Sequence, residues 1–204
     1  MKSKKFKKIS KNIYEIKNAL PERVAKKILA EFKNHSYKSW KLISQKKPTH
    51  YSHVFKNSSK FLPNKEEVYL AKFYRNDKLK NNYFIDLSVK KFIFPLIKKY
   101  LKFNVKDYDI RCHKFIKNNF LRLHYDDYAG KYAITLNLNK TWKWDWGGIL
   151  SIPAGKAEEN LFSFCPSWNS LNICYSGKKT TPHYVTPIQP YAKSPRYSIT
   201  VFIK

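Results

Sequence analysis

The sequence predicts a mainly β fold in which a few helices support an antiparallel sandwich or barrel. Residues 105–204 contain short segments in which apolar and polar residues alternate, as in strands with one buried face. Helical periodicity, in contrast, is confined to the first half of the chain. A length of 204 residues with 43% hydrophobic residues can fill one core, so we expect a single domain over residues 1–204.

Two amphipathic helices are expected in the first half. The first begins at Pro21, which is tolerated in a first helical turn, and ends near Phe32. The second runs from about Ile85 to Leu101, and Pro95 is expected to kink it. Residues 35–64 have no sustained period between these helices and are interpreted as a long loop or an irregular hairpin.

The second half supplies the strands, near residues 108–115, 131–138, 148–152, 170–175, 183–188 and 196–203. In the last of them Arg196, Ser198 and Thr200 share one face, opposite an apolar face. The strand over 131–138 likewise places Thr135 and Asn137 opposite apolar residues. If helices cover the apolar faces, the polar faces line a barrel, where a buried arginine needs an anionic partner. A bound dicarboxylate would supply that partner.

The chain is strongly basic, with 41 Lys and Arg against 14 Asp and Glu and a formal net charge of +27. Such an imbalance indicates polyanion partners such as nucleic acid, but lysine supplies most of it beside abundant Asn and Ile, and an AT-rich coding bias explains that equally well. The N-terminal cluster Lys2, Lys4, Lys5, Lys7 and Lys8 is expected to be a frayed, solubilising tail.

Cysteine use and hydropathy bear on the compartment. Cys112, Cys165 and Cys174 are odd in number and lack CxxC spacing, which indicates neither a disulfide framework nor a zinc site. No apolar run approaches the roughly 18 to 20 residues that cross a bilayer, and residues 1–17 lack the apolar segment of a signal peptide. We expect a cytoplasmic monomer without a membrane partner.

The sharpest local feature is His124-Tyr125-Asp126. On a strand, His124 and Asp126 project from the same face and can reach one cation, while Asp127 turns away. With His183 near the C-terminus they form a set of two histidines and one carboxylate, the facial triad of non-haem Fe(II) oxygenases. The remaining histidines are interpreted as solvated or core residues: His35, His50, His53 and His113.

Several motifs, in order, resemble those of a known family. They are Leu138-Asn139-Lys140-Thr141-Trp142, Gly147-Gly148-Ile149-Leu150, Pro153-Ala154-Gly155-Lys156-Ala157, Thr181-Pro182-His183 and Arg196-Tyr197-Ser198-Ile199-Thr200. Residues 108–204 thereby resemble the egl-nine type prolyl hydroxylases that modify hypoxia-inducible factor, within the 2-oxoglutarate/Fe(II)-dependent dioxygenase superfamily. The resemblance implies a double-stranded β-helix (jelly-roll or cupin-like) core over residues 105–204. Residues 1–104 would then supply helices packed on one sheet and a loop that covers the substrate.

The resemblance also implies chemistry. Fe(II) would bind to His124, Asp126 and His183, and 2-oxoglutarate would chelate the iron. Arg196 would bind the distal carboxylate of 2-oxoglutarate, assisted by Thr200, in a pocket that includes Ser198, Asn137 and Thr135. The reaction consumes O2, with ascorbate as an optional addition, and releases succinate and CO2. The favoured substrate is a proline-containing polypeptide.

Two positions depart from the family pattern. A tyrosine that precedes the first metal histidine in the family corresponds to Phe115, and a second family tyrosine aligns with Asn137. A pocket of different shape and polarity is therefore expected. Residues 187–191 also lengthen the interval between His183 and Arg196, which a loop can absorb.

Three other functions stay open at this stage. The first is oxidative demethylation of nucleic acid, ranked lower because the second arginine usual in those enzymes is Phe202 here. The second is hydroxylation of a free amino acid or small metabolite. The third is a non-enzymatic, basic RNA- or protein-binding module on a degenerate barrel. Trp144 and Trp146 are candidates for a stacking platform, whereas Trp142 is expected to pack around a hairpin.

Overall fold

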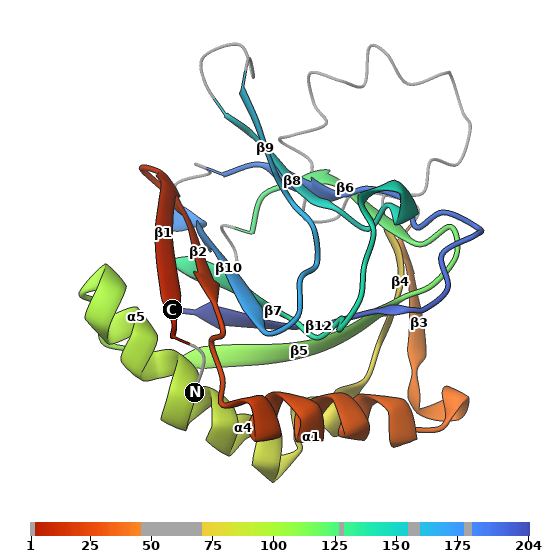
Figure 1. Ribbon diagram of the computed structural model, residues 1–204, viewed down its shortest axis with the longest axis horizontal. Helices are drawn as coiled ribbons and strands as arrows, with labels where there is room; N and C mark the ends of the chain where they lie inside the picture. Colours follow the sequence, from red (N-terminus) through yellow and green to blue (C-terminus); the bar gives the residue numbers. More distant parts are fainter. Residues whose placement is uncertain (1–2, 46–70, 127–128, 155–159, 178–180) are drawn as a thin grey trace.

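A curled antiparallel sheet dominates the computed structural model, which describes residues 3–45, 71–126, 129–154, 160–177 and 181–204 (Figure 1). Its strands follow the order β1-β2-β10-β7-β12-β5-β4-β6-β11-β8-β9, with β3 paired to β4. Their bounds are β1 (Lys5–Ser10), β2 (Ile13–Lys17), β3 (Lys41–Gln45), β4 (Ala71–Arg75), β5 (Tyr108–Phe115), β6 (Phe120–His124), β7 (Tyr132–Asn137), β8 (Leu150–Ala154), β9 (Asn160–Phe164), β10 (Ser170–Tyr175), β11 (His183–Val185) and β12 (Arg196–Ile203). The prediction of a mainly β, double-stranded β-helix fold is confirmed.

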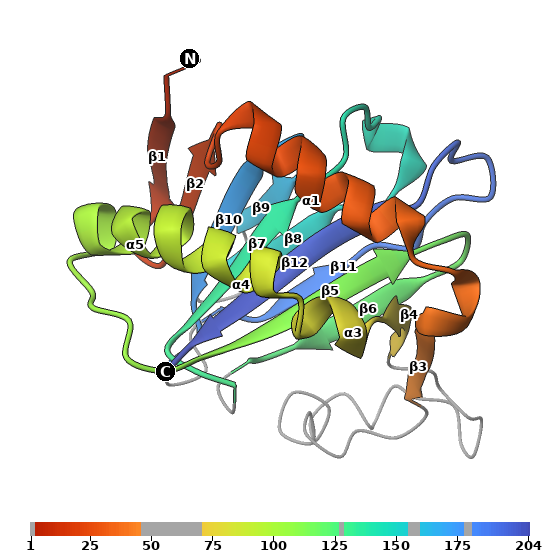
Figure 2. The same cartoon turned by 90° about the horizontal axis from the view of Figure 1, so that it is seen from below.

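The helices form a layer on one face of this sheet (Figure 2). They are α1 (Glu22–Asn34), α3 (Asp77–Lys80), α4 (Tyr83–Ser88), the π-helical turn η3 (Val89–Ile93) and α5 (Phe94–Leu101), with the 3-10 turns η1 (Tyr37–Ser39) and η4 (Trp144–Trp146) elsewhere. In the part of the chain that the structure describes, no helix combines the length and the apolar character needed to cross a membrane.

The main core lies between the helices and the sheet. From β12 it takes Tyr197, Ile199, Val201 and Ile203, which pack with α1 residues such as Phe32. The alternate residues of β12 turn to the opposite, concave face of the sheet, where they line a cavity. The strand alternation predicted for this segment is therefore confirmed, and helices cover its apolar face.

The structure corrects the expectation for the N-terminal lysine cluster. Lys5, Lys7 and Lys8 belong to β1, which pairs with β2, so the expectation of a frayed tail was wrong for these residues. The strand holds because Phe6, between the lysines, stacks on Tyr100 with ring centroids 4.4 Å apart. The described residues up to 104 therefore supply four strands as well as helices.

The second predicted helix is interrupted at a different place. Asn82 caps it, since its Oδ1 accepts the backbone N–H groups of Phe84 and Ile85 at 2.9 and 3.2 Å. The irregularity is the π turn over 89–93, and Pro95 follows it in the first turn of α5, where a missing N–H costs little. Of the long loop, residues 41–45 form β3, and residues 46–64 lie outside the described part.

Candidate metal and cosubstrate site

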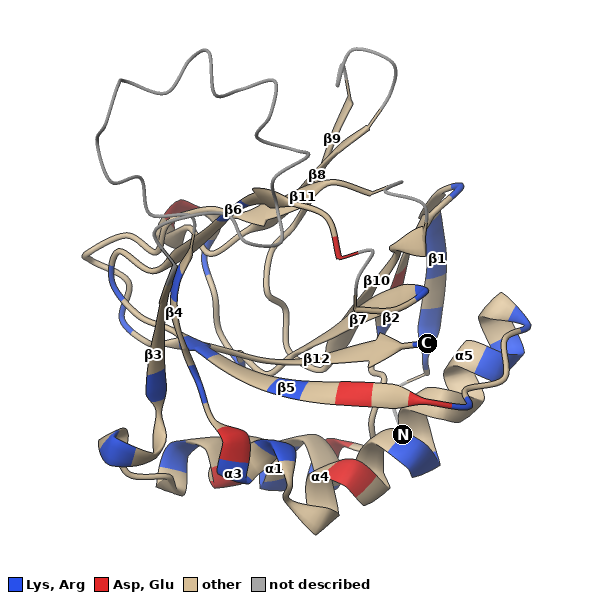
Figure 3. Cartoon of the chain, turned by 180° about the vertical axis from the view of Figure 1, so that it is seen from behind, with Lys and Arg blue, Asp and Glu red and all other residues tan. Residues whose placement is uncertain are grey.

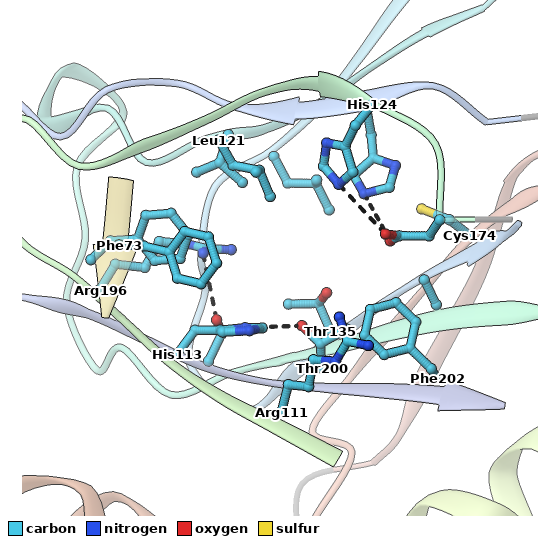
Figure 4. A pocket seen from close by; sticks show the side chains of 17 residues that line it. Phe73, Arg111, His113, Leu121, His124, Thr135, Cys174, Arg196, Thr200 and Phe202 are labelled. Carbon is cyan, nitrogen blue, oxygen red and sulfur yellow. Dashed lines mark hydrogen bonds and ion pairs between the residues drawn. The ribbon is translucent and has the colours of Figure 1, made fainter. Parts of the chain in front are cut away.

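A cavity of about 90 Å³ lies inside the curled sheet. Side chains from β5, β7 and β12 line one side of it, and side chains from β6, β8 and β11 line the other. His124 lies at one end of the cavity and Arg196 at the other, as Figure 4 shows. Two groups of residues predicted from the sequence therefore share one enclosed space.

The first group is the triad of His124, Asp126 and His183. His124 ends β6 and His183 begins β11, and the two residues are paired directly in the antiparallel ladder. Asp126 follows two residues after His124, so one ligand atom from each of the three lies within 4.8 Å of the others. The Nε2 atoms of His124 and His183 are 3.6 and 3.1 Å from the Asp126 carboxylate oxygens.

Backbone carbonyls fix the orientation of both imidazole rings. Nδ1 of His124 lies 2.8 Å from the carbonyl oxygen of Arg122, and Nδ1 of His183 lies 3.1 Å from that of Thr181. When Nδ1 carries the proton, each Nε2 is left with a lone pair directed at the shared point. A buried set of two imidazole nitrogens and one carboxylate suits Fe(II).

Electrostatics keep the carboxylate ionised. Burial alone would raise the pKa of Asp126, but His183 and His124 outweigh it and hold that pKa well below its ordinary value. For His183 the directions are reversed: burial lowers its pKa, but the Asp126 carboxylate outweighs burial and raises the pKa on balance. The pocket therefore stabilises positive charge at this point, and a divalent cation could replace the proton on His183.

The second group surrounds Arg196, whose side chain is buried with 3% exposure. Its Nη1 and Nη2 donate to Ser198 Oγ and Asn137 Oδ1 only at 3.5 Å, and its Nε has no partner among the described residues. Burial lowers the pKa of Arg196 to about 10. A guanidinium so weakly satisfied fits an anionic ligand, because an uncompensated buried charge is costly.

The other predicted pocket residues divide into two sets. Ser198, Thr200 and Thr135 line the cavity. Asn137 is buried behind it, where its Nδ2 donates to Asn172 Oδ1 at 2.7 Å while its Oδ1 faces Arg196. Phe115, at the position of the missing tyrosine, lies under the guanidinium at 5.2 Å from the ring centroid. The structure thus places all five predicted cosubstrate residues in or next to one pocket.

Sequence reasoning missed two polar residues that β5 turns into the cavity. His113 was interpreted as a solvated or core residue; it is buried but lines the cavity, with Nδ1 3.3 Å from Thr200 Oγ1. Burial and the charges of Arg111 and Arg196 lower the pKa of His113 to about 3. Arg111 lies over the Phe202 ring at 4.5 Å and pairs with Asp109. The alternation of β5 was the signal that could have placed both. His50, His53 and Asp127 lie outside the described residues.

The three tryptophans also separate. Trp142 packs around the hairpin as expected: its Nε1 donates to the carbonyl oxygen of Gly147 at 2.9 Å, and its ring meets that of Trp146 edge to face. Trp146 is buried, so it cannot present a stacking surface. Trp144, in contrast, is 61% exposed.

Comparison with known proteins agrees with this geometry. Residues 110–204 match the 2OG-Fe(II) oxygenase superfamily. Among solved structures, a Pseudomonas putida prolyl-4-hydroxylase is 17% identical with a TM-score of 0.63, covering 95% of this chain and 92% of that one. A Trichoplax adhaerens prolyl hydroxylase in complex with a hypoxia inducible factor peptide fragment is also 17% identical, with a TM-score of 0.63, over 95% and 84% of the two chains. The viral collagen prolyl hydroxylase of Paramecium Bursaria Chlorella virus-1 is 12% identical, with a TM-score of 0.52, over 95% and 96%. No curated protein matches the sequence.

These findings define the class of protein. Residues 110–204 form a 2OG-Fe(II) oxygenase domain, which supports a 2-oxoglutarate-dependent dioxygenase. More particularly, its fold is that of the prolyl 4-hydroxylases. The family uses Fe(II), 2-oxoglutarate and O2, and the His124, Asp126 and His183 cluster is the candidate site for the iron.

Proposed function

We propose that this dioxygenase hydroxylates a prolyl residue of a polypeptide, with succinate and CO2 as co-products. The observation that carries the proposal is the single cavity that joins the buried triad to the weakly satisfied Arg196. The polypeptide substrate rests on the prolyl hydroxylases of the same fold, one of which was solved with a peptide fragment.

In this proposal His124, Asp126 and His183 hold Fe(II), and Arg196 holds the distal carboxylate of 2-oxoglutarate. The fit of these residues supports it, because the histidines present Nε2 toward the carboxylate and the guanidinium has an unused buried Nε. Ser198, Thr200, Asn137 and Thr135 complete the polar wall around that carboxylate. When bound, iron and 2-oxoglutarate together activate O2 and supply the oxidant.

The chain's own part is to position and protect. Backbone carbonyls orient the imidazole rings, and the strand ladder sets the spacing of the two histidines. Apolar side chains, among them Phe115, Leu150 and Val185, limit water in the cavity. His113 is neutral at pH 7 because its pKa is about 3, so it can hydrogen-bond a carboxylate or the Thr200 hydroxyl without adding charge.

Anaerobic titration with Fe(II) and then 2-oxoglutarate tests the two binding roles. We expect a visible charge-transfer band that saturates in the wild-type protein, is lost in Asp126→Ala and needs far more 2-oxoglutarate in Arg196→Ala. Circular dichroism shows whether each variant is folded. A folded wild-type protein without the band would contradict the assignment of the site.

A mass-spectrometric screen tests the substrate. Proline-containing peptides, free proline and methylated single-stranded DNA are incubated with the enzyme, Fe(II) and 2-oxoglutarate, and succinate is measured in parallel. We expect peptide oxidation that depends on the proline and is absent in Asp126→Ala. Turnover of free proline or DNA alone would replace this proposal with one of the other reactions of the superfamily.

A further inference from the structure

The two ends of the curled sheet border a second hollow. β1 and β9 are the terminal strands of the sheet order (Figure 1), and a groove of about 510 Å³ has residues of both in its lining. We call it the edge groove; β1 and β2 contribute Lys7, Ile9, Glu15 and Lys17, β9 contributes residues 161–164, and Trp142, Trp144, Cys165 and Ser167 complete it. It shares none of its residues with the barrel cavity.

The strands beside the groove have free edges. In the described part of the chain β1 pairs only with β2, and β9 pairs only with β8. Such an edge can accept an extended polypeptide as an additional strand, because its outward backbone groups have no partner strand. The groove therefore offers main-chain hydrogen bonds as well as side-chain contacts.

Two large apolar side chains are exposed at this groove. Trp144 is 61% exposed and Leu161 is 56% exposed. The turn that carries Trp144 is anchored, since Tyr191 donates its hydroxyl to the backbone carbonyl of Asp145 at 2.7 Å. A firmly positioned, exposed tryptophan beside an open strand edge is typical of a peptide contact point.

The charge around the groove selects the partner. Lys7 and Lys17 line it, and Glu15 is already within 4.0 Å of Lys17. Lys5 and Lys8 add positive charge to the same strand, and Figure 3 shows β1 mostly in the colour of basic residues. Lysines on an edge strand repel a second copy of that strand and attract an acidic one.

We propose that the edge groove binds an extended, acidic segment of a partner polypeptide as an added strand, with Trp144 as its apolar anchor. The groove shares no lining residue with the barrel cavity, and the proposal does not rest on the proposed prolyl substrate. It also gives one part of the large positive charge a specific role.

Fluorescence anisotropy with synthetic peptides tests the proposal. The probe is a labelled strand-forming peptide of alternating Glu and Val. Two comparison peptides are used: one has Lys in place of Glu, and the other has alternate backbone nitrogens methylated. We expect the wild-type protein to prefer the Glu peptide. Backbone methylation should weaken binding at least about tenfold if the peptide adds as a strand. Trp144→Ala should also cost about tenfold or more, the effect typical of an anchor tryptophan.

Charge reversal provides the decisive comparison. The pair Lys7→Glu and Lys17→Glu should reverse the preference toward the Lys peptide, whereas Lys98→Glu with Lys99→Glu on α5, the same change in net charge, should leave it intact. Equal effects of both pairs, tighter binding of oligothymidylate than of the Glu peptide, or no peptide binding would overturn the proposal. Asp126→Ala should bind the Glu peptide like the wild type, so failure of the catalytic site is distinguished from failure of the groove.

Discussion

Replacement of Arg196 by methionine should stabilise the protein without ligand. Burial lowers the pKa of this guanidinium from 12.5 to about 10. At roughly 1.4 kcal/mol per pKa unit, this shift means that the buried charge destabilises the folded state by about 3 kcal/mol. The folded pKa of a base lies below the unfolded one here, so the full cost is present at every pH below about 10, including pH 7.

The gain is reduced by the contacts that methionine loses. The guanidinium lies 5.2 Å from the Phe115 ring centroid, a contact that contributes about 1 kcal/mol. Its hydrogen bonds to Ser198 and Asn137 are long at 3.5 Å, and Asn137 keeps its bond to Asn172. The net increase in the free energy of unfolding is about 2 kcal/mol, which for a chain of this size raises Tm by roughly 4–8 °C.

Thermal unfolding followed by circular dichroism measures this change, under nitrogen with Fe(II) and with or without 2-oxoglutarate. Ligand that binds the folded state raises Tm, so 2-oxoglutarate should stabilise the wild type and should have little effect on Arg196→Met. Arg23→Met, at an exposed position of α1, is the matched control and should change neither value. A lower Tm for Arg196→Met with an unchanged response to 2-oxoglutarate would refute the reasoning.

Three further outcomes are expected. The pKa of His113 is about 3 in the folded state and 6.5 in the unfolded state, so between these pH values only the unfolded state binds the proton. The free energy of unfolding should therefore fall by up to about 5 kcal/mol from pH 6.5 to pH 3. Urea titrations should show a shallower decrease for His113→Gln than for the wild type. Gly147→Ala would put a Cβ 1.9 Å from the Pro187 carbonyl oxygen at a φ of +69°, and chemical denaturation should show a loss of about 3 kcal/mol or more; wild-type stability would contradict the backbone assignment. Ile199→Ala, at a fully buried position between the sheet and the helices, should lower the free energy of unfolding by about 2–5 kcal/mol. Leu161→Ala, at an exposed position, should change it little, and similar losses in both variants would count against this packing.

The sequence was most informative where a strand has one clear face. β5, β10 and β12 have the bounds that the sequence predicts, because apolar residues recur at every second position along most of each strand. The same alternation placed Arg196 and Thr200 on the concave face, where they line the cavity. The prediction that His124 and Asp126 share one face likewise required only that this segment be extended.

Short strands at the ends of the sheet were not predictable from local pattern. Among the described residues, β1 pairs only with β2 and β9 only with β8, so each has one strand neighbour and no second strand that would bury it into a clear apolar face. The role of β5 in the cavity was hidden for a related reason: the face it turns inward carries His113 and Arg111 together with Phe115, a mixture that marks neither a buried nor an exposed face. Only closure of the sheet decides which face is inside.

The long interval between β11 and β12 shows how the two halves of the cavity stay in register. This segment is tied at both sides, since the backbone of Ile188 exchanges hydrogen bonds with Asn118 and Asn119 at 2.9 and 3.0 Å, and Gln189 N–H donates to the Trp146 carbonyl at 2.9 Å. The extra residues are thus fixed to the turn between β5 and β6 and to η4. The ladders on either side then position the two groups: β11 pairs His183 with His124 of β6, and β12 pairs Arg196 with Phe115 of β5. Because the extra residues are tied down between these ladders, they lengthen the connection without displacing either strand.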